Sequence, residues 1–400
     1  MKSDRDVFIV SYARTPMGSF RGSLEEFPAT SLGSIAIKGA LSKLSHAIAT
    51  TDIDSVTMGH VLTGGCGQST ARQAAIAAGL PMNIPAFSVD KVCASGMKAV
   101  ALAASAIRNG DEEICIAGGM ESMSRVPFHL DSIRSGRRMG HDHVFDGLIR
   151  DGLWDVYNNE HMGSCTEKVN ERMGISREAM DAYAIETHRR AKEAIAQGLF
   201  RDEIIPVLTS QKTVSVDEQV DRVKPEKLPT LKPSFKVDGR ITAGNASPVS
   251  DGAAALVLVS RKIAASRGLR PLVRIVVCAD AAREPEDFTI APALAIQKVL
   301  LKANLSLRDI GVWEMNEAFA TVVLANAMIL GHEIDLKNVN ILGGALALGH
   351  PLGCSGARII CTLITAMRIR GASFGCAAIC NGGGGASGII LELCSQNSTL

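Results

Sequence analysis

The side chains best suited to chemistry begin with Cys93, which stands between an extended run and a helix-like stretch. A thiol at the start of a helix lies near the positive end of the helix dipole and near free N–H groups, which favour the thiolate. The small neighbours Ala94, Ser95 and Gly96 leave room for a reagent. A lone cysteine is more often a buried structural residue, so the assignment of Cys93 as a nucleophile depends on its companions.

A histidine set among glycines is the second feature. The segment 343–353 contains four glycines and places His350 directly before Pro351, which predicts a constrained turn that a substrate can approach. Histidine is the usual general base near neutral pH. Considered alone, His350 is equally well explained as an ordinary loop histidine.

A second cysteine and an asparagine complete the set. Cys380 ends a strand-like run and precedes Gly382–Gly385, which lets backbone N–H groups point into a cavity. The next run, Ile389–Leu393, is typical of a strand rather than a helix, so a phosphate-binding loop is disfavoured. Asn316 precedes a helix-like run, where an asparagine is usually only an N-cap.

Two cysteines, one histidine and one asparagine together suit acyl transfer combined with carbanion chemistry. One thiolate holds the acyl group, and a second group removes a proton next to a carbonyl. Hydrogen-bond donors stabilise the oxygen anion that forms at each step. The four residues are far apart in the sequence, so the fold must bring them together.

An internal repeat predicts how this happens. In the first half, the extended run Phe87–Val89 leads through Cys93 and a Ser-Gly pair into a helix, and the next strand ends in glycines. In the second half, Val339–Leu342 leads in the same order through Gly353 and a Ser-Gly pair, so Cys93 corresponds to Gly353. Two copies of one α/β unit predict pseudo-symmetric domains whose strand ends share one ligand-binding edge. The two helices are expected over residues 97–108 and 357–370.

The predicted domains are residues 1–270 and 271–400, with a region of different composition, about residues 121–249, inserted in the first. This region is rich in Arg, His and Met and contains one amphipathic helix that starts near Ser176 and ends at Gly198. We expect the insertion to cover a site. The alternative is a surface elaboration without function.

Composition excludes several classes of protein. With 400 residues, 46% hydrophobic and 21% charged, the chain is typical of a globular protein of two or three domains. The net charge of +1 gives no general attraction to nucleic acid or to an anionic membrane, and no apolar run approaches the ~18–20 residues that span a bilayer. Ten cysteines without a Cys-x-x-Cys pair predict neither a disulfide framework nor a zinc site, and the pair His141 and His143 is expected in a solvated loop.

The first residues lead at once into a strand-like run, Val7–Val10, and include acids, so neither a signal peptide nor a transit peptide is expected. The last residues do not match the peroxisomal Ser-Lys-Leu address. We therefore expect a cytoplasmic protein, or a mitochondrial one if a presequence has been removed.

Over essentially its whole length the chain resembles the thiolase family, and within it most closely the acetoacetyl-CoA thiolases. Four separated catalytic motifs in the right order make the resemblance specific. It implies the thiolase fold, in which two pseudo-symmetric α/β/α halves form a five-layered αβαβα core with an inserted loop domain. The segments that carry it are Val10–Pro16, Val92–Lys98, Ala117–Ser122, His161–Gly163, Asn245–Ser247, Asn316–Phe319, Gly349–Pro351 and Cys380–Gly384.

The resemblance implies an acetyl-CoA C-acetyltransferase that converts two acetyl-CoA reversibly into acetoacetyl-CoA and coenzyme A by a ping-pong mechanism. It implies that Cys93 carries the acetyl group and that His350 activates Cys93. With Asn316, through a water, His350 would form one oxyanion hole. Cys380 would exchange the alpha proton of the second acetyl-CoA, and the N–H groups of Cys93 and Gly382 would form the other hole.

The resemblance also implies that coenzyme A, a substrate and product, binds against the inserted region. Arg222 and Lys227 would meet the nucleotide phosphates, for which cations are suited, although a solvated charged surface is the alternative. Ser247 would touch the pantetheine arm, and Met162 would narrow the acyl pocket as in short-chain enzymes. The full set of candidates is Leu148, His161, Met162, Arg222, Lys227 and Ser247.

Other implications concern ions and assembly. A subset of relatives that includes potassium-responsive enzymes also has an asparagine at the position of Asn381. However, His188 stands where those enzymes use a tyrosine, which argues against potassium activation. No other cofactor and no metal site is implied. The segment Arg125–Met139 lies where relatives carry a tetramer-forming loop, so a homotetramer, a dimer of dimers, is expected.

Three other functions are compared with this one. A degradative thiolase acting on longer 3-ketoacyl-CoA is disfavoured by the pair His161 and Met162. A decarboxylating condensing synthase would be expected to carry another base in place of Cys380. A non-catalytic acyl-CoA or lipid carrier would be expected to lack at least one of the four catalytic residues, and all four are present.

Overall fold

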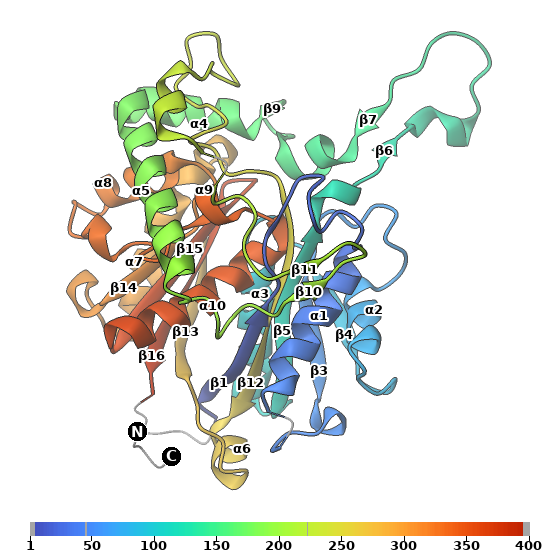
Figure 1. Cartoon of the computed structure of the whole chain (residues 1–400), viewed down its shortest axis with the longest axis vertical. Helices are drawn as coiled ribbons and strands as arrows, with labels where there is room; N and C mark the ends of the chain where they lie inside the picture. Colours follow the sequence, from blue (N-terminus) through green and yellow to red (C-terminus); the bar gives the residue numbers. More distant parts are fainter. Residues whose placement is uncertain (1–4, 45, 222, 395–400) are drawn as a thin grey trace.

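The computed structural model describes residues 5–394 except residues 45 and 222. A ten-stranded sheet forms its centre, in the order β14-β15-β16-β13-β1-β12-β5-β3-β4, and β2 pairs with β12 (Figure 1). Its strands are β1 (Val7–Arg14), β2 (Gly18–Ser19), β3 (Ser55–Gly59), β4 (Ala86–Val89), β5 (Ile114–Ser122), β12 (Ser250–Ser260), β13 (Val273–Ala282), β14 (Val312–Met315), β15 (Phe374–Asn381) and β16 (Gly385–Leu393).

The strand order repeats outward from the centre of the sheet, where β1 and β13 are joined by only two residue pairs. On one side β12, β5 and β3 follow β1, and on the other side β16, β15 and β14 follow β13. Strand β5 is parallel to β3 and antiparallel to β12, and β15 is likewise parallel to β14 and antiparallel to β16. The predicted pseudo-symmetric halves are therefore confirmed.

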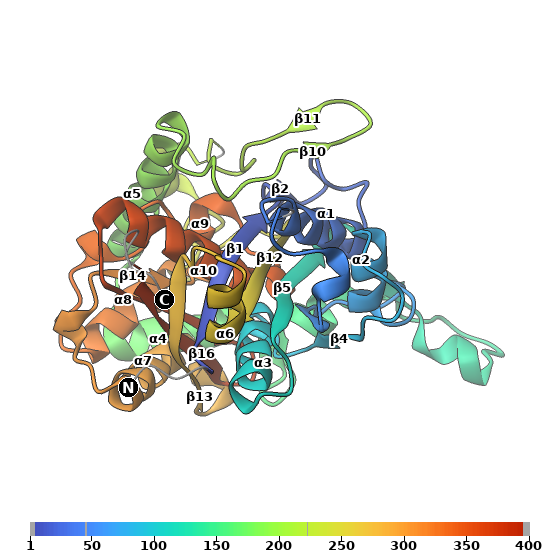
Figure 2. The same cartoon turned by 90° about the horizontal axis from the view of Figure 1, so that it is seen from below.

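Helices form three layers around the two halves of the sheet. Helices α3 (Ser95–Asn109) and α10 (Leu352–Arg370) pack against each other and against strands of both halves. Helices α1 (Ala29–Ser42) and α2 (Thr70–Ala77) cover the outer face of the first half, and α7 (Ala291–Ala303), with α8 (Ala320–Ile329) beside it, covers that of the second (Figure 2). The expected five-layered αβαβα core is confirmed.

Glycines in the two Ser-Gly motifs explain how α3 and α10 approach so closely. A Cβ on Gly96 would lie 2.7 Å from the backbone nitrogen of Ala357 and 2.8 Å from the carbonyl oxygen of Gly353. A Cβ on Gly356 would lie 2.4 Å from the nitrogen of Met97. Because real Cβ atoms do not tolerate such distances, each motif needs glycine where the other helix begins.

Helix α10 corrects one expectation. Its length of 19 residues and a mean hydropathy of 1.3 in its most apolar window are compatible with a membrane span, whereas no apolar run of that length was expected. In the fold, 89% of that window is buried inside the protein. A helix enclosed between two halves of a sheet is apolar on all sides for the same reason that a membrane helix is.

The repeat is incomplete at one position. The first copy contains a real strand, β4, but Val339–Leu342 does not form its expected counterpart, and only Val339 makes an isolated bridge, to Trp313. Asn340 has a left-handed φ of 48° and turns the chain. Its side chain accepts from the N–H of Met315 and donates to the carbonyl of Met315, both at 2.8 Å, so an amide side chain replaces strand pairing.

Residues 123–249 lie between β5 and β12 and contain α4 (Met162–Met173) and α5 (Arg177–Ala196). Ser176 caps α5 by accepting the N–H of Ala179, as the sequence predicts. Although this region is inserted in the first half of the sequence, α4 and α5 pack against α8, and α5 packs against α9 (Ala345–Leu348), in the second half (Figure 1). The insertion thus covers the segment that contains His350.

A hairpin arm, residues 127–147, leaves the body of the molecule in both views (Figures 1 and 2). Its base is the pair β6 (Phe128–His129) and β7 (Phe145–Asp146). His141 and His143 lie exposed in this arm, as expected. The remaining short elements are β8 (Trp154–Asp155), β9 (Glu160–His161), β10 (Val207–Leu208), β11 (Thr213–Val214) and α6 (Arg261–Ser266).

Candidate active site

The four predicted catalytic side chains come from the ends of repeated elements, and all four are buried. Asn316 directly follows β14, and Cys380 is the penultimate residue of β15. Cys93 lies two residues before α3, and His350 lies between α9 and α10. The helix after Asn316 begins only at Ala320, so the alternative that Asn316 is an N-cap is wrong.

The thiol of Cys93 lies against backbone donors and a second thiol. The N–H groups of Gly382 and of Cys93 itself hydrogen-bond to it and lower its pKa, but burial outweighs them and raises the pKa to about 12. Burial and the neighbouring Cys93 raise the pKa of Cys380 well above its ordinary value. The expectation of a resting thiolate at Cys93 is therefore wrong, because the helix starts later, at Ser95, and desolvation dominates.

The residue before the nucleophile has an unusual backbone conformation. Val92 has a φ of 47°, which is rare for a β-branched residue and costs energy. Two hydrogen bonds hold it there, from its N–H to Asp90 Oδ1 at 2.9 Å and from Ser95 Oγ to its carbonyl at 2.6 Å. A Cβ on Gly382 would lie 3.6 Å from Val92 Cγ1, so this turn sets Cys93 beside the glycine loop.

Hydrogen bonds determine which nitrogen of His350 carries the proton. Ser355 Oγ donates its only proton to the carbonyl of Pro351 at 2.8 Å. The Nδ1 atom of His350 lies 2.6 Å from Ser355 Oγ. Ser355 must then accept from Nδ1–H, which leaves Nε2 with a lone pair. Burial, and then the charge of Arg358, lower the pKa of His350 to about 3, so the ring is a neutral base.

The backbone of His350 is held where the inserted region meets the start of β12. Its N–H lies 3.2 Å from Ser250 Oγ, which in turn donates to the carbonyl of Pro248 at 2.9 Å. Gly349 has a φ of 120°, and a Cβ there would lie 2.5 Å from Ser250 Oγ. Sequence reasoning missed Ser250 entirely. It did note the motif that contains Ser355, but assigned that serine no role.

Asn316 joins the base to the second half of the sheet. Its N–H donates to the carbonyl of Ala378 at 3.0 Å, and its Nδ2 lies 3.4 Å from His350 Nε2. Its Oδ1 is buried and has no hydrogen-bond partner among the described residues. The pair of Asn316 and His350 thus presents one amide donor and one ring nitrogen to a common point.

A buried carboxylate next to Asn316 clamps three segments together. Glu317 Oε1 accepts from Tyr183 at 2.7 Å and from Asn340 at 2.7 Å, and Oε2 accepts from the N–H of Leu346 at 3.0 Å. Thr187 donates to the same carboxylate at 2.9 Å. Helix α5, the Asn316 loop and α9 are therefore linked through one side chain, which sequence reasoning also missed although it lies inside the Asn316 motif.

Met162, which is predicted to narrow the acyl pocket, lies near the glycine loop that contacts Cys93. A Cβ on Gly382 would lie 3.7 Å from Met162 Cε. His161 accepts the N–H of Gly163 through Nδ1 at 3.1 Å and stacks on Phe235 at 4.7 Å between ring centres. Leu148 is buried in the same apolar cluster as Cys93. The contacts of the described residues thus place Met162 beside the glycine loop, and they join neither His161 nor Leu148 directly to the thiols.

The polar residues predicted to bind coenzyme A have fewer contacts with the site than Met162 has. The N–H of Ser247 donates to the carbonyl of Ala318 at 3.0 Å, so Ser247 borders the Asn316 loop. Lys227 is exposed in the turn Pro225–Thr230, and no contact joins it to the thiols among the residues described. Arg222 lies outside the described residues.

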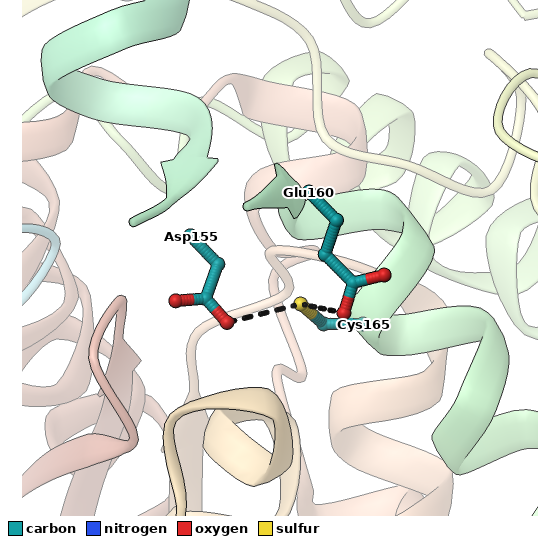
Figure 3. Close-up of side chains that lie close together, drawn as sticks. All are labelled: Asp155, Glu160 and Cys165. Atoms are coloured by element: carbon teal, nitrogen blue, oxygen red, sulfur yellow. Dashed lines mark hydrogen bonds between the residues drawn. The ribbon is translucent and has the colours of Figure 1, made fainter. Parts of the chain in front are cut away.

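One cluster in the described part of the chain has metal-ligand side chains within reach of one another: Asp155, Glu160 and Cys165 (Figure 3). Its groups are already partnered. The thiol of Cys165 lies 3.3 Å from Glu160 Oε1 and 3.6 Å from Asp155 Oδ2, and Glu160 also pairs with Lys168 at 2.7 Å. The contacts are those of a structural link between the β8–β9 hairpin and α4.

Comparisons with known proteins match nearly the whole chain to one family. Residues 7–262 match the family described as Thiolase, N-terminal domain, and residues 269–393 match Thiolase, C-terminal domain. Acetyl-CoA acetyltransferase 2 from Arabidopsis thaliana is 50% identical over 396 residues, which cover 97% of each chain. The mitochondrial acetyl-CoA acetyltransferase from Rattus norvegicus is 48% identical, over 97% of this chain and 91% of its own. A crystal structure of a thiolase from Ascaris suum in complex with coenzyme A is 42% identical with a TM-score of 0.93, over 97% of this chain and 100% of that one.

Proposed function

Because the chain belongs to the thiolase family, we propose that it is an acetyl-CoA C-acetyltransferase, which converts two acetyl-CoA reversibly into acetoacetyl-CoA and coenzyme A. The observation that carries the proposal is the setting of Cys93. Its thiol lies against the N–H of Gly382 and beside Cys380, and Asn316 at the end of β14 lies next to His350, which precedes α10. Relatives named acetyl-CoA acetyltransferase support it at 46–50% identity.

In the first half-reaction, Cys93 takes the acetyl group from acetyl-CoA. The lone pair on His350 Nε2 accepts the thiol proton as the sulfur attacks the carbonyl carbon, and the proton then passes to the departing coenzyme A thiolate. The pKa values of about 12 for Cys93 and about 3 for His350 mean that both groups start neutral. The N–H groups of Cys93 and Gly382 stabilise the oxygen anion of the tetrahedral intermediate.

In the second half-reaction, a new carbon–carbon bond replaces the bond to sulfur. Cys380 passes its proton to His350 Nε2, and the thiolate so formed takes the alpha proton of a second acetyl-CoA. The enolate oxygen is stabilised by the imidazolium N–H of His350 and by Asn316 Nδ2, two groups that lie 3.4 Å apart. The enolate carbon attacks the acetyl carbonyl, and the bond to Cys93 breaks. His350 then returns its proton to the Cys93 thiolate, and Cys380 keeps the alpha proton, so both thiols are restored.

The acyl pocket supports a short substrate. Met162 lies beside the Gly382 turn, and His161, the residue before it, stacks on Phe235. Each additional methylene would have to displace this packed wall, which costs roughly 1–3 kcal/mol in comparable pockets. We therefore assign the two-carbon acyl unit to this site rather than longer chains.

Thiolysis of acetoacetyl-CoA by free coenzyme A, run beside a longer 3-ketoacyl-CoA, tests the proposal. We expect acetoacetyl-CoA to be cleaved faster, Cys93→Ala to abolish cleavage, and the control Cys394→Ala, a half-buried thiol outside the site, to retain it. Preference for the longer substrate would establish the degradative activity instead. A folded protein that cleaves neither substrate would overturn the enzymatic assignment.

We further propose a homotetramer, a dimer of dimers. The arm presents apolar side chains to solvent, among them Met139 at 92% exposure and Phe128 at 66%. Strand β4 lies at the end of the strand order, so one of its edges is open within the described sheet. An open strand edge can pair with another chain, and projecting apolar surface marks a site of interaction. Light scattering tests the assembly, and a monomer at micromolar concentration would contradict it.

We propose that potassium does not activate the enzyme. The ring of His188 is buried, and its Nδ1 lies 3.2 Å from the carbonyl oxygen of Val220, an oxygen of the type that coordinates potassium. Burial lowers the pKa of His188, so the ring is neutral. Equal rates in potassium and sodium chloride at the same ionic strength are expected, and a severalfold higher rate in potassium would contradict the proposal.

Two further assignments stay with this proposal. We assign Lys227 and Ser247, with Arg222, to coenzyme A, with the nucleotide phosphates on the two cations. We also assign the enzyme to the cytoplasm and its two thiolase domains to residues 1–270 and 271–400. The relatives include both cytosolic and mitochondrial proteins, so cell fractionation distinguishes the compartments.

A further inference from the structure

The half of the fold that does not carry the nucleophile contains a pseudo-equivalent site, which corresponds to the active site through the internal repeat. Gly353 occupies in the second copy of the repeat the place that Cys93 occupies in the first. Glu121 lies 28 residues after Cys93, and Asn381 lies 28 residues after Gly353. In this pseudo-equivalent site the N–H of Gly353 is therefore the counterpart of the N–H of Cys93. The N–H of Cys93 is one of the two donors that lie against the sulfur of Cys93.

A carboxylate from the chain itself fills this second site. Glu121 Oε2 accepts from the N–H of Gly353 at 2.9 Å and from that of Val61 at 3.1 Å, and Oε1 accepts from that of Leu62 at 3.2 Å. His60 Nε2 lies 3.2 Å from Oε1. Three converging backbone donors and an imidazole are the components of an anion hole, and here the anion is built in.

The charges of the pair match this role. The side chains of His60 and Glu121 are both fully buried. Burial alone lowers the pKa of His60, but hydrogen bonds to Cys66 and Glu121 and the charge of Glu121 outweigh it and raise the pKa to about 9. At neutral pH the pair is therefore an imidazolium and a carboxylate, and neither charge is left alone in the interior.

Gly353 connects the carboxylate of Glu121 to the segment that contains His350. It lies three residues after His350, in the first turn of α10. A Cβ on Gly353 would lie 2.9 Å from Glu121 Oε2, and a Cβ on Gly119 would lie 2.0 Å from the carbonyl oxygen of Gly353. The first turn of α10 is thus fixed on both sides by groups from the Cys93 half of the fold.

We propose that Glu121, paired with His60, is a positioning residue. It occupies the anion hole of the pseudo-equivalent site and thereby fixes the His350 segment relative to Cys93. The inference rests on the proposed function, since it concerns the base of that reaction. Glu121 touches no reacting atom. Its effect passes through Gly353 and the start of α10 to the imidazole.

Two variants of Glu121 and one matched control test this role. Glu121→Gln keeps an acceptor oxygen but loses the charge, and Glu121→Ala removes both. The control Glu203→Gln also removes a fully buried charge, one that touches α10 through Thr365 and pairs with Arg14, far from the His350 end of the helix. Each variant is assayed for thiolysis and for the rate at which iodoacetamide alkylates Cys93, followed on the Cys93 peptide by mass spectrometry as a function of pH.

For Glu121→Ala we expect kcat to fall about tenfold or more, because a small displacement of a catalytic group has effects of this size. The KM for acetoacetyl-CoA should change little, Cys93 alkylation should slow in parallel, and Glu121→Gln should lie between. Glu203→Gln should keep both rates. If Glu121→Ala does not fold, Glu121→Gln alone decides.

Parental alkylation and parental kcat in a folded Glu121→Gln would overturn the proposal, and so would an equal loss in Glu203→Gln, which would show a general effect of buried charge. The outcome is separable from the proposed function. If the parent does not cleave acetoacetyl-CoA, the enzymatic assignment fails, and the alkylation series still decides whether Glu121 positions the base.

Discussion

The Nδ1 atom of His350 lies 2.6 Å from the hydroxyl oxygen of Ser355, and that hydroxyl donates its proton to the carbonyl of Pro351. The serine can therefore only accept from the ring, and the lone pair of the imidazole faces Asn316. In the proposed mechanism, a base with a fixed tautomer needs no reorientation before it accepts the proton of Cys93. Ser355 thus acts on the proposed chemistry through the histidine that it orients.

Ser355→Ala should lower kcat for acetoacetyl-CoA thiolysis by roughly tenfold, because the ring loses the acceptor that fixes its tautomer, while the KM stays near that of the parent. Ser105→Ala is the matched control, since Ser105 donates to the carbonyl four residues earlier in α3 in the same way as Ser355 in α10. Stopped-flow or steady-state assays at several pH values provide the measurement. Equal kcat values for Ser355→Ala and the parent would contradict the assignment of the tautomer.

Glu317→Gln should destabilise the protein by about 1–3 kcal/mol, because an amide nitrogen would face donors that now meet a carboxylate oxygen. The buried donors are Tyr183, Thr187, Asn340 and the N–H of Leu346. Urea denaturation followed by circular dichroism measures the change. Tyr183→Phe removes one donor and should cost less, so an equal or larger loss in Tyr183→Phe would argue against a clamp centred on Glu317.

The sequence was sufficient to predict the repeat, its correspondence of Cys93 with Gly353 and the fold class, because each copy is marked by the same local order of strand, Ser-Gly turn and helix. It was not sufficient to predict the residues that hold the site in place. Glu121 and Gly353 are separated by 232 positions, and nothing in the local pattern around either residue indicates the other. Such pairs are determined by how the two halves pack.

Electrostatics were also beyond the local pattern. The position of Cys93 before a helix predicts a thiolate, but the pKa depends on burial that arises only when α3 and α10 enclose the site. The same enclosure explains why α10 became long and apolar enough to be compatible with a membrane span. The strand expected at Val339–Leu342 failed for a different reason, since Asn340 substitutes its side chain for the backbone pairing.

The pair of His60 and Glu121 predicts a pH dependence of stability. Because the pKa of His60 is raised from 6.5 to about 9, its contribution is fully present below pH 6.5 and is lost as the pH rises through 9. A shift of this size corresponds to about 3 kcal/mol. The groups that face His60 are Glu121, Cys66, Thr70 and Asp90.

The measurement is the free energy of unfolding of the parent and of His60→Gln between pH 6 and pH 10. The difference between the two proteins should shrink as the pH rises, because other titrating groups contribute equally to both. A difference that stays constant over this range would show that His60 is neutral in the folded protein.

Met162→Ala should widen the acyl pocket. Removal of the side chain beside Gly382 gives longer 3-ketoacyl chains room, so their kcat/KM relative to that of acetoacetyl-CoA should rise by about tenfold or more, the order expected for a few methylenes. The control Met173→Ala changes the same residue type at the other end of α4 and should leave the ratio unchanged. An unchanged ratio in Met162→Ala would show that another residue limits chain length.

The arm makes the last prediction, which concerns assembly. Ile133 and Met139 are 60% and 92% exposed on a hairpin that projects from the body (Figure 2), and in a tetramer these apolar surfaces would be buried. Ile133→Glu combined with Met139→Glu should therefore reduce the mass measured by light scattering from tetramer to dimer, because charges would be buried without partners. Leu301→Glu, a matched change at an apolar side chain that is 81% exposed on α7, should leave a tetramer. Thiolysis per subunit should persist in the double variant, since the arm contributes no group to the reaction, and a double variant that remains tetrameric would place the interface elsewhere on the surface.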